Sequence, residues 1–452
     1  MTQNRTRRAL FWMVVVALIL RLTIMLFVYS QNLDPQVDHW SFGFEEGRVA
    51  RALASGQGFS NPLYAPTGPT AWFAPVYPMI VAGVFKVFGI YSKASCLAIL
   101  SFNCLVSALT CIPIFFFARR SFGEGVAKLA GWIWAFFPDA VYGPNSRIWD
   151  TWLATLLLAT LFLVVLRLED SDRAQNWIGF GLLSGVAALT SPVLLSVLPI
   201  LALWMLFRLH QQRKRWLVPA LSALFAVLLV VTPWTVRNYH MFHRLIPISD
   251  CLGLEIGIGN PGSASYFYSK SAGPWDPWKN GSEWHEFREM GEVRYFDWKG
   301  EQGTAYIKGH PQWYAGMVAR RILNVWTNFW SLSESYLRRD PAGPATVPLY
   351  TLLSVLALLG LWRAFRESGV GVAMPYAIVL FFFPLIYYLT HTGDWYRRPI
   401  DSFFVVLAAS TIVSLQQRLH LSTNWLRGKK ILIWQTPDAS PSETEARVRL
   451  RA

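Results

Sequence analysis

The sequence contains few charged residues. Only 15% of its 452 residues are Asp, Glu, Lys or Arg, whereas soluble domains carry roughly 25%. Hydrophobic residues make up 53% of the chain and aromatic residues 15%. This composition excludes an ordinary soluble domain and predicts an all-α polytopic membrane protein, because a helix satisfies its own backbone hydrogen bonds inside a bilayer.

Cysteines and nucleotide-binding motifs are also scarce. Three of the four cysteines (Cys96, Cys104 and Cys111) share one apolar run and Cys251 stands alone, so no disulfide framework, zinc site or CxxC redox motif is indicated. No Walker or Rossmann motif is present, and the glycine-rich GIGNPG at 257–262 lacks the following Lys-Ser/Thr of a phosphate loop. These absences argue against an ATP-driven pump and against an enzyme that uses nucleotide sugars.

Long apolar runs are abundant. A spanning helix needs about 20 mostly apolar residues, and the first run is too long for a signal peptide and lacks a small-residue cleavage site, so it is expected to remain as a span. The segment 72–91 contains Pro75, Pro78 and Lys86 and is expected to lie at the membrane interface. Ten spans are predicted, at 9–29, 94–118, 124–143, 149–166, 177–192, 193–208, 216–234, 346–363, 373–390 and 400–416.

The positions of the basic residues predict the orientation. Lys and Arg concentrate in short cytoplasmic loops of membrane proteins, and with ten spans every basic turn falls on the same side as the N-terminus. Both termini are therefore expected in the cytoplasm, and the net charge of +14 is explained by topology rather than by nucleic acid. The basic turns are at 5–8, 119–120, 167–173, 208–215, 363–366 and 418–430.

Four regions follow from this topology. Residues 1–234 form an N-terminal transmembrane module that includes a long first outer loop at 30–93, and residues 235–345 form a second, larger outer loop. Residues 346–416 form the C-terminal spans, and 417–452 a basic, partly disordered cytoplasmic tail. The outer face is expected to be periplasmic, in a bacterial inner membrane.

The first outer loop carries two adjacent acids. A short helix is predicted from Phe42 to Ser55, in which Glu45 and Glu46 flank an apolar stripe while Arg48 and Arg51 point the other way. Such a helix should lie on the membrane surface, where burial raises the pKa of a carboxyl group. Solvated or paired charges on a surface helix are the alternative, and periodicity does not choose between the two glutamates.

A second acid begins the fourth span. Asp150 precedes a long apolar run, and an acid just inside a spanning helix is costly and usually has a partner or a function. Asp139, near the outer end of the third span, is a weaker candidate of the same kind.

Arginines also lie on the outer side, where positive charge is not favoured by topology. Arg237, next to Asn238, ends the seventh span, and Arg397 and Arg398 follow Tyr396 before the last span. An arginine can bind a phosphate through two hydrogen bonds, although contact with lipid headgroups would explain these residues equally well. An acid that deprotonates an acceptor and an arginine that neutralises a leaving phosphate suit transfer from a phospholipid-linked donor.

Several pieces of the sequence resemble the GT-C superfamily of membrane glycosyltransferases, in its bacterial branch of protein mannosyltransferases and lipid A aminoarabinose transferases. The resemblance covers most of 9–415. The pieces are FGFEEGRVARALASGQGFS, GPTAWFAPVYPMIVAGVFKVFG, Trp149-Asp150, PWTVRNYHMF with GIGNPG, HPQWYAGMVARRILNVW and WYRRPID. The chain departs from the family at Phe42-Gly43, where better-known members have Asp-Glu, and at Phe73-Ala74, where the aminoarabinose enzyme has Glu-Lys.

The resemblance implies a GT-C-like bundle with two interface helices in the first outer loop, at 42–56 and 72–89. It implies a polyprenyl-phosphate sugar donor, a catalytic base in the first loop and a second acid at a later span. The family pattern favours Glu45 over Glu46 as the base and assigns the second acid to Asp150. A divalent metal ion shared by these two residues remains open.

The predicted function is therefore an inverting glycosyltransferase that acts on a lipid, glycan or protein acceptor. Arg237, Asn238, Tyr396, Arg397 and Arg398 are the candidate substrate-binding residues. The sequence predicts no nucleic-acid partner.

A transporter or flippase of a lipid-linked glycan is the alternative, but it would favour charge in mid-membrane and an internal repeat. An assembly factor without catalysis is a third reading. Aromatic residues in the large loop, which could stack on sugar or anchor the loop at the interface, are Tyr268, Trp275, Trp278 and Trp284.

Overall fold

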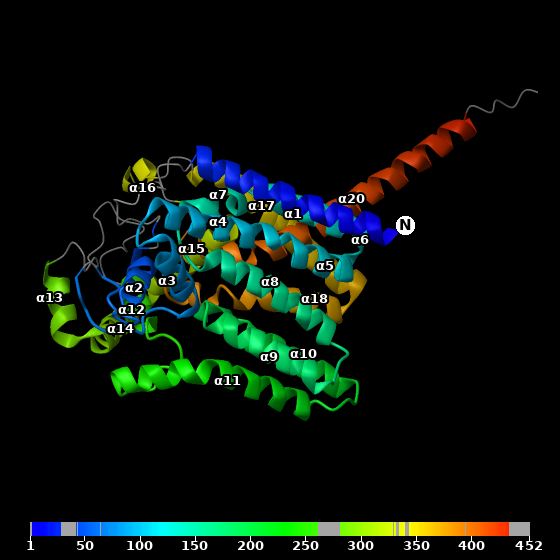
Figure 1. Ribbon diagram of the computed structural model, residues 1–452. Coiled ribbons are helices and arrows are strands. Elements are labelled where there is room, and N and C mark those ends of the chain that lie inside the picture. Colours follow the sequence, from blue (N-terminus) through cyan, green and yellow to red (C-terminus); the bar gives the residue numbers. More distant parts are fainter. Residues whose placement is uncertain are drawn as a thin grey trace, which may run out of the picture.

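The computed structural model (Figure 1) describes residues 2–28, 42, 44–63, 65–260, 281–328, 330, 334–339, 343–393 and 395–433. In these residues every regular element is helical, apart from one isolated antiparallel bridge between Ser60 and Pro69. The predicted all-α class is confirmed.

Long helices form the bundle. Eight segments in the described residues are long and apolar enough to cross a membrane. Their helices are α1 (Thr2–Phe27), α4 (Lys93–Leu109) with α5 (Cys111–Phe122), α8 (Thr151–Leu168), η3 (Pro192–Ser196) with α10 (Leu198–Gln211), α11 (Leu217–Phe242), α17 (Gly343–Arg363) with η4 (Ala364–Ser368), α18 (Val370–Phe382) with α19 (Leu385–Leu389), and α20 (Arg398–Ile433).

The two other predicted spans correspond to shorter helices. The segment 124–143 folds as α6 (Glu124–Phe136) and α7 (Pro138–Ser146), which meet at Phe137 and Pro138, and 177–192 folds as α9 (Ala174–Ala188). Proline at the first position of α7 fits there because that position needs no backbone N–H donor. Both segments run alongside the long helices in Figure 1, α6 beside α1 and α9 beside α11.

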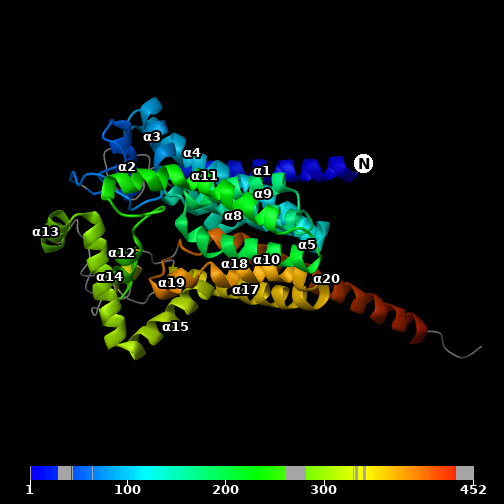
Figure 2. The same ribbon diagram turned by 90° about the horizontal axis from the view of Figure 1, so that it is seen from below.

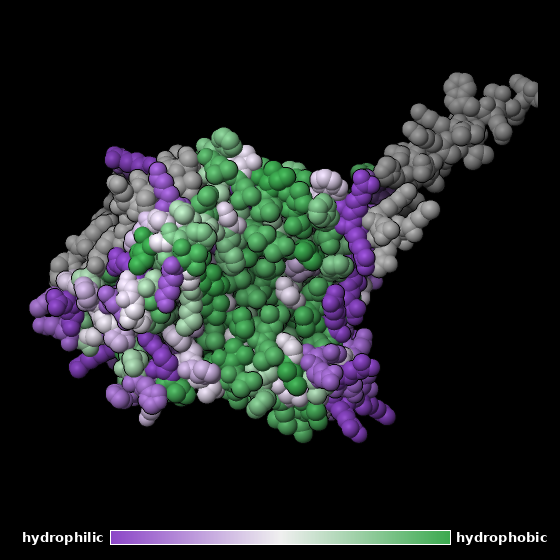
Figure 3. Space-filling view, in the orientation of Figure 1, coloured by the Kyte–Doolittle hydropathy of each residue, from purple (hydrophilic) through white to green (hydrophobic). Residues whose placement is uncertain are grey.

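The bundle has the surface of a membrane domain. A broad apolar belt lies between two polar ends in Figure 3. Large apolar side chains of α11 are exposed, among them Leu221, Phe225 and Leu229, which are 57%, 66% and 59% exposed. Because lipid can cover such residues, their exposure needs no partner protein.

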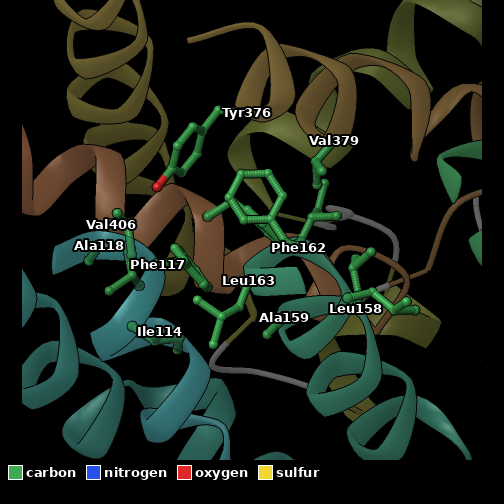
Figure 4. Close-up of a cluster of buried hydrophobic side chains, with 14 of the residues drawn as sticks. Ile114, Phe117, Ala118, Leu158, Ala159, Phe162, Leu163, Tyr376, Val379 and Val406 are labelled. Carbon is green, nitrogen blue, oxygen red and sulfur yellow. The ribbon is translucent and has the colours of Figure 1, made fainter. Parts of the chain in front are cut away.

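Close packing of aromatic and aliphatic side chains holds the bundle together. Phe117 of α5 stacks on Phe403 of α20, with ring centroids 5.4 Å apart, and Phe162 of α8 lies between Tyr376 and the same Phe403 at 4.7 and 4.8 Å. Figure 4 shows part of this cluster, in which Phe117 of α5, Phe162 of α8 and Tyr376 of α18 come together from three helices. The core thus joins the N-terminal and C-terminal halves of the chain.

A buried arginine of the first helix lies inside the bundle. Arg21 of α1 is fully buried and donates to the Ser107 hydroxyl and to the backbone carbonyls of Ala17, Trp134 and Ala135 at 2.9 to 3.2 Å. These bonds tie α1 to α4 and α6, so this mid-span charge has a structural explanation and does not indicate a transport path.

The outer loops gather at one end of the bundle, opposite the N-terminus and the projecting part of α20 (Figures 1 and 2). Helices α14 and α15 form an angled arm beside the bundle end in Figure 2. The elements here are α2 (Phe44–Ala54), α3 (Val76–Phe88), α12 (Leu252–Gly259), α13 (Gly281–Met290), α14 (Glu292–Gly309), α15 (Pro311–Thr327) and α16 (Glu334–Arg339).

Candidate active site

Helix α2 lies inside the outer end of the protein. Seven of its eleven residues are buried. Phe42, just before the helix, packs with side chains of α3 and α4, while Val49 packs with the ends of α9 and α11. The expected apolar stripe is therefore present, and burial extends beyond it because neighbouring loops enclose α2. The expected position at the membrane surface stays a prediction.

The sharp start of this helix depends on a glycine. A Cβ atom at Gly47 would lie 1.7 Å from the backbone oxygen of Phe42, so no side chain fits there. This close approach explains why a glycine follows the glutamate pair.

The arginines of α2 do not point to solvent as a pair. Arg48 is fully buried, donates to the Pro62 carbonyl at 3.3 Å and lies 4.4 Å from the ring centroid of Phe44. Arg51 is half-buried and lies 5.8 Å from the Tyr91 ring centroid. The expectation that both point away from the buried face was wrong for Arg48, because the following loop folds back over it.

Glu45 combines burial with an available oxygen. Its side chain is 6% exposed, and its Oε2 atom is buried without a hydrogen-bond partner in the described part of the chain. Burial raises the pKa of Glu45 to about 7; the charges of Arg48 and Arg147 oppose this rise, and that of Glu255 adds to it. A carboxylate in this state is suited to accept a proton near neutral pH.

Glu46 faces the second predicted acid, Asp150. Burial raises the pKa of Glu46 well above its usual value, and the charges of Asp150 and Glu45 add to the rise. Burial also raises the pKa of Asp150 to about 7, while a hydrogen bond from Ser191 acts in the opposite direction. Two buried carboxyl groups that interact in this way are not easily ionised together.

The predicted acids therefore come together from two elements. Helix α2 supplies Glu45 and Glu46, and the residue that precedes α8 is Asp150. Ser191, in the turn between α9 and η3, joins them through its hydrogen bond with Asp150. Adjacent positions on a helix point about 100° apart, so the two glutamates face different neighbours.

An arginine accompanies the acids. The guanidinium carbon of Arg147 lies 3.9 Å from the ring centroid of Trp395 and 5.8 Å from that of Trp149. Its charge lowers the pKa values of Glu45 and Tyr396, against the larger effect of burial. Arg147 thus acts on the proposed base together with Arg48 of the same helix as Glu45.

A second polar cluster borders this one. Glu255 of α12 lies 3.1 Å from His391, measured from Oε2 to Nδ1, and the His391 Nε2 atom is 2.8 Å from the Tyr396 hydroxyl. Burial raises the pKa of Glu255 to about 7 and lowers that of His391 to about 3. Tyr396 also stacks on Tyr387, with centroids 4.4 Å apart. Tyr396 is one of the predicted substrate-binding residues, and the structure links it through His391 to the carboxyl group of Glu255.

Arg237 and Asn238 have partners in the first outer loop and its surroundings. Arg237 donates to the carbonyls of Phe59 and Thr70, each at 2.7 Å, and to the Asn238 side chain at 2.9 Å. Asn238 is fully buried and donates to the carbonyls of Ile246 and Ile248. These bonds hold the loop that follows α2 against the end of α11.

Arg397 and Arg398 also have partners in the scaffold. Arg397 is 4% exposed, donates to Asp401 at 2.6 Å and to the Val325 carbonyl at 3.1 Å. Arg398 lies 3.4 Å from Asp139, whose other oxygen accepts a 2.6 Å bond from the Tyr350 hydroxyl. The structure thus brings Asp139 to Arg398, and the role of these arginines at a donor phosphate remains a prediction.

Some predicted features lie outside the described residues or remain untested. Tyr268, Trp275 and Trp278 are not among the described residues, whereas Trp284 of α13 stacks on Phe287 with centroids 6.3 Å apart. The described residues contain no group of three or more His, Cys, Asp or Glu arranged to hold a metal ion. Two carboxylates can hold Mg²⁺ when a substrate phosphate supplies further ligands, so the shared metal ion remains a prediction.

Sequence reasoning missed Arg147, Glu255 and His391. Arg147 stands three residues before Asp150 in a short outer loop, and the reasoning applied to Arg397 and Arg398 could have identified it. Glu255 and His391 are single residues in separate loops, and nothing local in the sequence indicates that they meet.

Comparison with known proteins agrees with this architecture. A family model described as dolichyl-phosphate-mannose-protein mannosyltransferase matches residues 72–236. A search of curated proteins gave no significant match.

Solved structures share the fold at low sequence identity. The archaeal oligosaccharyltransferase AglB from Archaeoglobus fulgidus, in complex with an inhibitory peptide and a dolichol-phosphate, has a TM-score of 0.50 and 15% identity, over 97% of this chain and 53% of AglB. The apo form of the Archaeoglobus fulgidus enzyme has a TM-score of 0.51 and 13% identity, over 95% of this chain and 53% of its own length. This chain therefore spans about half the length of these relatives.

ArnT from Cupriavidus metallidurans in its apo state has a TM-score of 0.37 and 15% identity, over 87% of this chain and 76% of ArnT. The family match over residues 72–236 and the fold shared with the oligosaccharyltransferase agree with the predicted resemblance.

Proposed function

We propose that this chain, which has the fold of the GT-C superfamily and a matching mannosyltransferase segment, is a membrane glycosyltransferase. It moves a sugar from a polyprenyl-phosphate donor to a lipid, glycan or protein acceptor on the periplasmic face. The main support for the proposal is that Glu45, Asp150 and Arg147 lie close together at the end of the bundle that holds the predicted outer loops. The solved AglB complex contains a dolichol-phosphate, which supports a lipid-phosphate donor.

Glu45 acts as the general base. Its buried Oε2 atom has no hydrogen-bond partner in the described residues, so it can accept the proton of an acceptor hydroxyl. The acceptor oxygen bonds to the anomeric carbon as the bond from that carbon to the phosphate oxygen breaks. Attack from the face opposite the phosphate inverts the anomeric configuration.

Arg147 neutralises the departing phosphate. The leaving group takes the bonding electrons, and a guanidinium ion can stabilise the resulting charge through two hydrogen bonds. Arg147 suits this role because its charge acts on Glu45, the proposed base.

Asp150 orients the acceptor, and Glu46 supports Asp150. Burial and the Asp150 charge raise the pKa of Glu46 well above its usual value, which favours the protonated carboxyl. Glutamine resembles a protonated glutamate in shape and in hydrogen bonding, so the structure supports a mild effect of Glu46→Gln.

Purified protein in proteoliposomes that contain a polyprenyl-phosphate sugar tests the proposal. We expect Glu45→Gln to lower transfer by at least about 100-fold, the usual contribution of general base catalysis, and Glu46→Gln to lower it less than about fivefold. Asp150→Asn should fall between them. Chelation of divalent ions in the same assay tests the metal prediction.

Two outcomes would contradict these roles. Near-wild-type turnover of folded Glu45→Gln would exclude Glu45 as the base, and a greater loss in Glu46→Gln would exchange the two roles. Lipid-linked sugar that crosses the bilayer without transfer to any acceptor would favour a flippase instead.

A further inference from the structure

The second outer loop and the last outer loop meet at His391. This residue lies in the connection between α19 and α20 and is 6% exposed. Its Nδ1 atom lies 3.1 Å from Glu255 of α12, and its Nε2 atom lies 2.8 Å from the hydroxyl of Tyr396. Segments more than 130 residues apart in the chain are therefore joined through one imidazole ring.

The two contacts determine which nitrogen holds the proton. A carboxylate beside Nδ1 favours a proton there, which leaves Nε2 to accept a hydrogen bond from the Tyr396 hydroxyl. Burial and the charge of Arg321 lower the pKa of His391 to about 3, so the ring stays neutral. A neutral ring with a fixed tautomer holds Tyr396 in one orientation.

Backbone contacts bring α12 against the same connection. A Cβ atom at Gly259 would lie 2.0 Å from the Thr390 carbonyl oxygen and 3.1 Å from the Cβ of His391. Arg321 of α15 donates to the Asn260 side chain at 2.9 Å and to the Leu389 carbonyl at 3.2 Å. The large outer loop therefore packs closely against the start of the connection between α19 and α20, where His391 lies.

The connection ends beside the arginine of the active site. Tyr396 stacks on Tyr387 and meets Trp395 edge to face at 5.3 Å. The guanidinium carbon of Arg147 in turn lies 3.9 Å from the centroid of the Trp395 ring. A change in the orientation of Tyr396 would therefore move the surface on which Arg147 rests.

We propose that Glu255, His391 and Tyr396 are positioning residues that hold Arg147, through Trp395, where it binds the donor phosphate. This inference rests on the proposed function, because it assumes that Arg147 binds the phosphate. None of the three residues needs to touch the reacting atoms. The large outer loop thus sets the affinity for the donor from a distance.

A double-mutant cycle tests the proposal. Binding of undecaprenyl phosphate to the full-length protein in detergent would be measured for the wild type, Arg147→Ala, His391→Phe and the double variant. We expect each single variant to bind about tenfold more weakly, which corresponds to 1.4 kcal/mol. The double variant should bind no more weakly than Arg147→Ala, because His391 acts through Arg147.

Conservative variants and transfer kinetics separate positioning from general damage. Tyr396→Phe keeps the stacked ring and loses the hydroxyl, so it should raise the donor KM while kcat and the acceptor KM stay within about twofold. His391→Gln, which retains a donor and an acceptor, should recover part of the affinity. The control is His310→Phe, an exposed histidine at the start of α15 whose Nδ1 is 3.0 Å from the Tyr306 carbonyl; it should bind normally.

Each remaining outcome overturns the inference in a recognisable way. Multiplicative losses in the double variant would show that His391 acts independently of Arg147. Normal binding by Arg147→Ala would remove the premise about the phosphate but leave the assay of Glu45 intact. A wild-type protein that does not bind undecaprenyl phosphate would reject both this inference and the proposed class of donor.

Discussion

At the scale of single residues, two adjacent glutamates have acquired different surroundings. Helical periodicity placed both beside an apolar stripe and could not choose between them. In the folded chain the charges of Arg147 and Glu255 act on Glu45, whereas those of Asp150 and Glu45 act on Glu46. The difference depends on loops that are distant in the sequence, so only the folded protein could reveal it.

The pKa of Glu45 predicts how transfer depends on pH. A general base must be deprotonated, and burial raises the pKa of Glu45 to about 7. We therefore expect kcat/KM to fall about tenfold for each pH unit below that value and to level off above it. A pH profile from 5 to 9 in proteoliposomes measures this.

Glu46→Gln provides the control for the pH profile, because Glu46 is not the proposed base and its replacement should leave the acidic limb in place. Activity that remains constant down to pH 5 would contradict the assignment of Glu45.

At the scale of elements, arginines predicted to bind substrate hold helices together. Arg397, at the start of α20, bonds to Asp401 of the same helix, to the Val325 carbonyl of α15 and to the Ser354 hydroxyl of α17 at 2.6 to 3.2 Å. Sequence topology correctly marked this residue as unusual on the outer side. It could not separate a ligand-binding role from a packing role, because both place a guanidinium group at the same depth.

Loss of this arginine should destabilise the bundle. Arg397→Leu would leave the Asp401 carboxylate buried without its partner, and breaking a buried pair in this way costs about 3–5 kcal/mol. Thermal unfolding in detergent should show a clearly lowered midpoint. The exposed Arg366→Leu near the end of α17 is the matched control and should unfold normally. Unchanged stability together with lost donor binding would instead favour the original phosphate-binding prediction.

At the scale of the whole molecule, hydropathy and basic loops predicted a bundle with its candidate site at one end. Eight described segments meet the criteria for spans, and the two shorter predicted ones, α6 with α7 and α9, lie in the same bundle. Sequence windows overestimated the helix length at 124–143, because Phe137 and Pro138 interrupt the helix while the apolar run continues through them.

The predicted topology can be tested with cysteine labelling. In a Cys251→Ser background, Ser55→Cys, at the exposed position just after α2 in the first outer loop, should react with a membrane-impermeant thiol reagent added to intact spheroplasts. Gln211→Cys, exposed at the end of α10, should react only after lysis. The remaining native cysteines are buried and serve as the background. The reverse pattern would place the candidate site on the cytoplasmic side.

By itself, the sequence determined the all-α class, most of the spans, the clustering of basic turns and the identities of Glu45, Glu46 and Asp150 as candidates. These features depend on local hydropathy, helical period and charge, which add up along the chain. Only the tertiary structure decided that Arg48 is buried, that Arg147 stands beside Glu45, and that His391 joins Glu255 to Tyr396. Such contacts depend on how separate loops fold over one another, and local composition carries no information about that geometry.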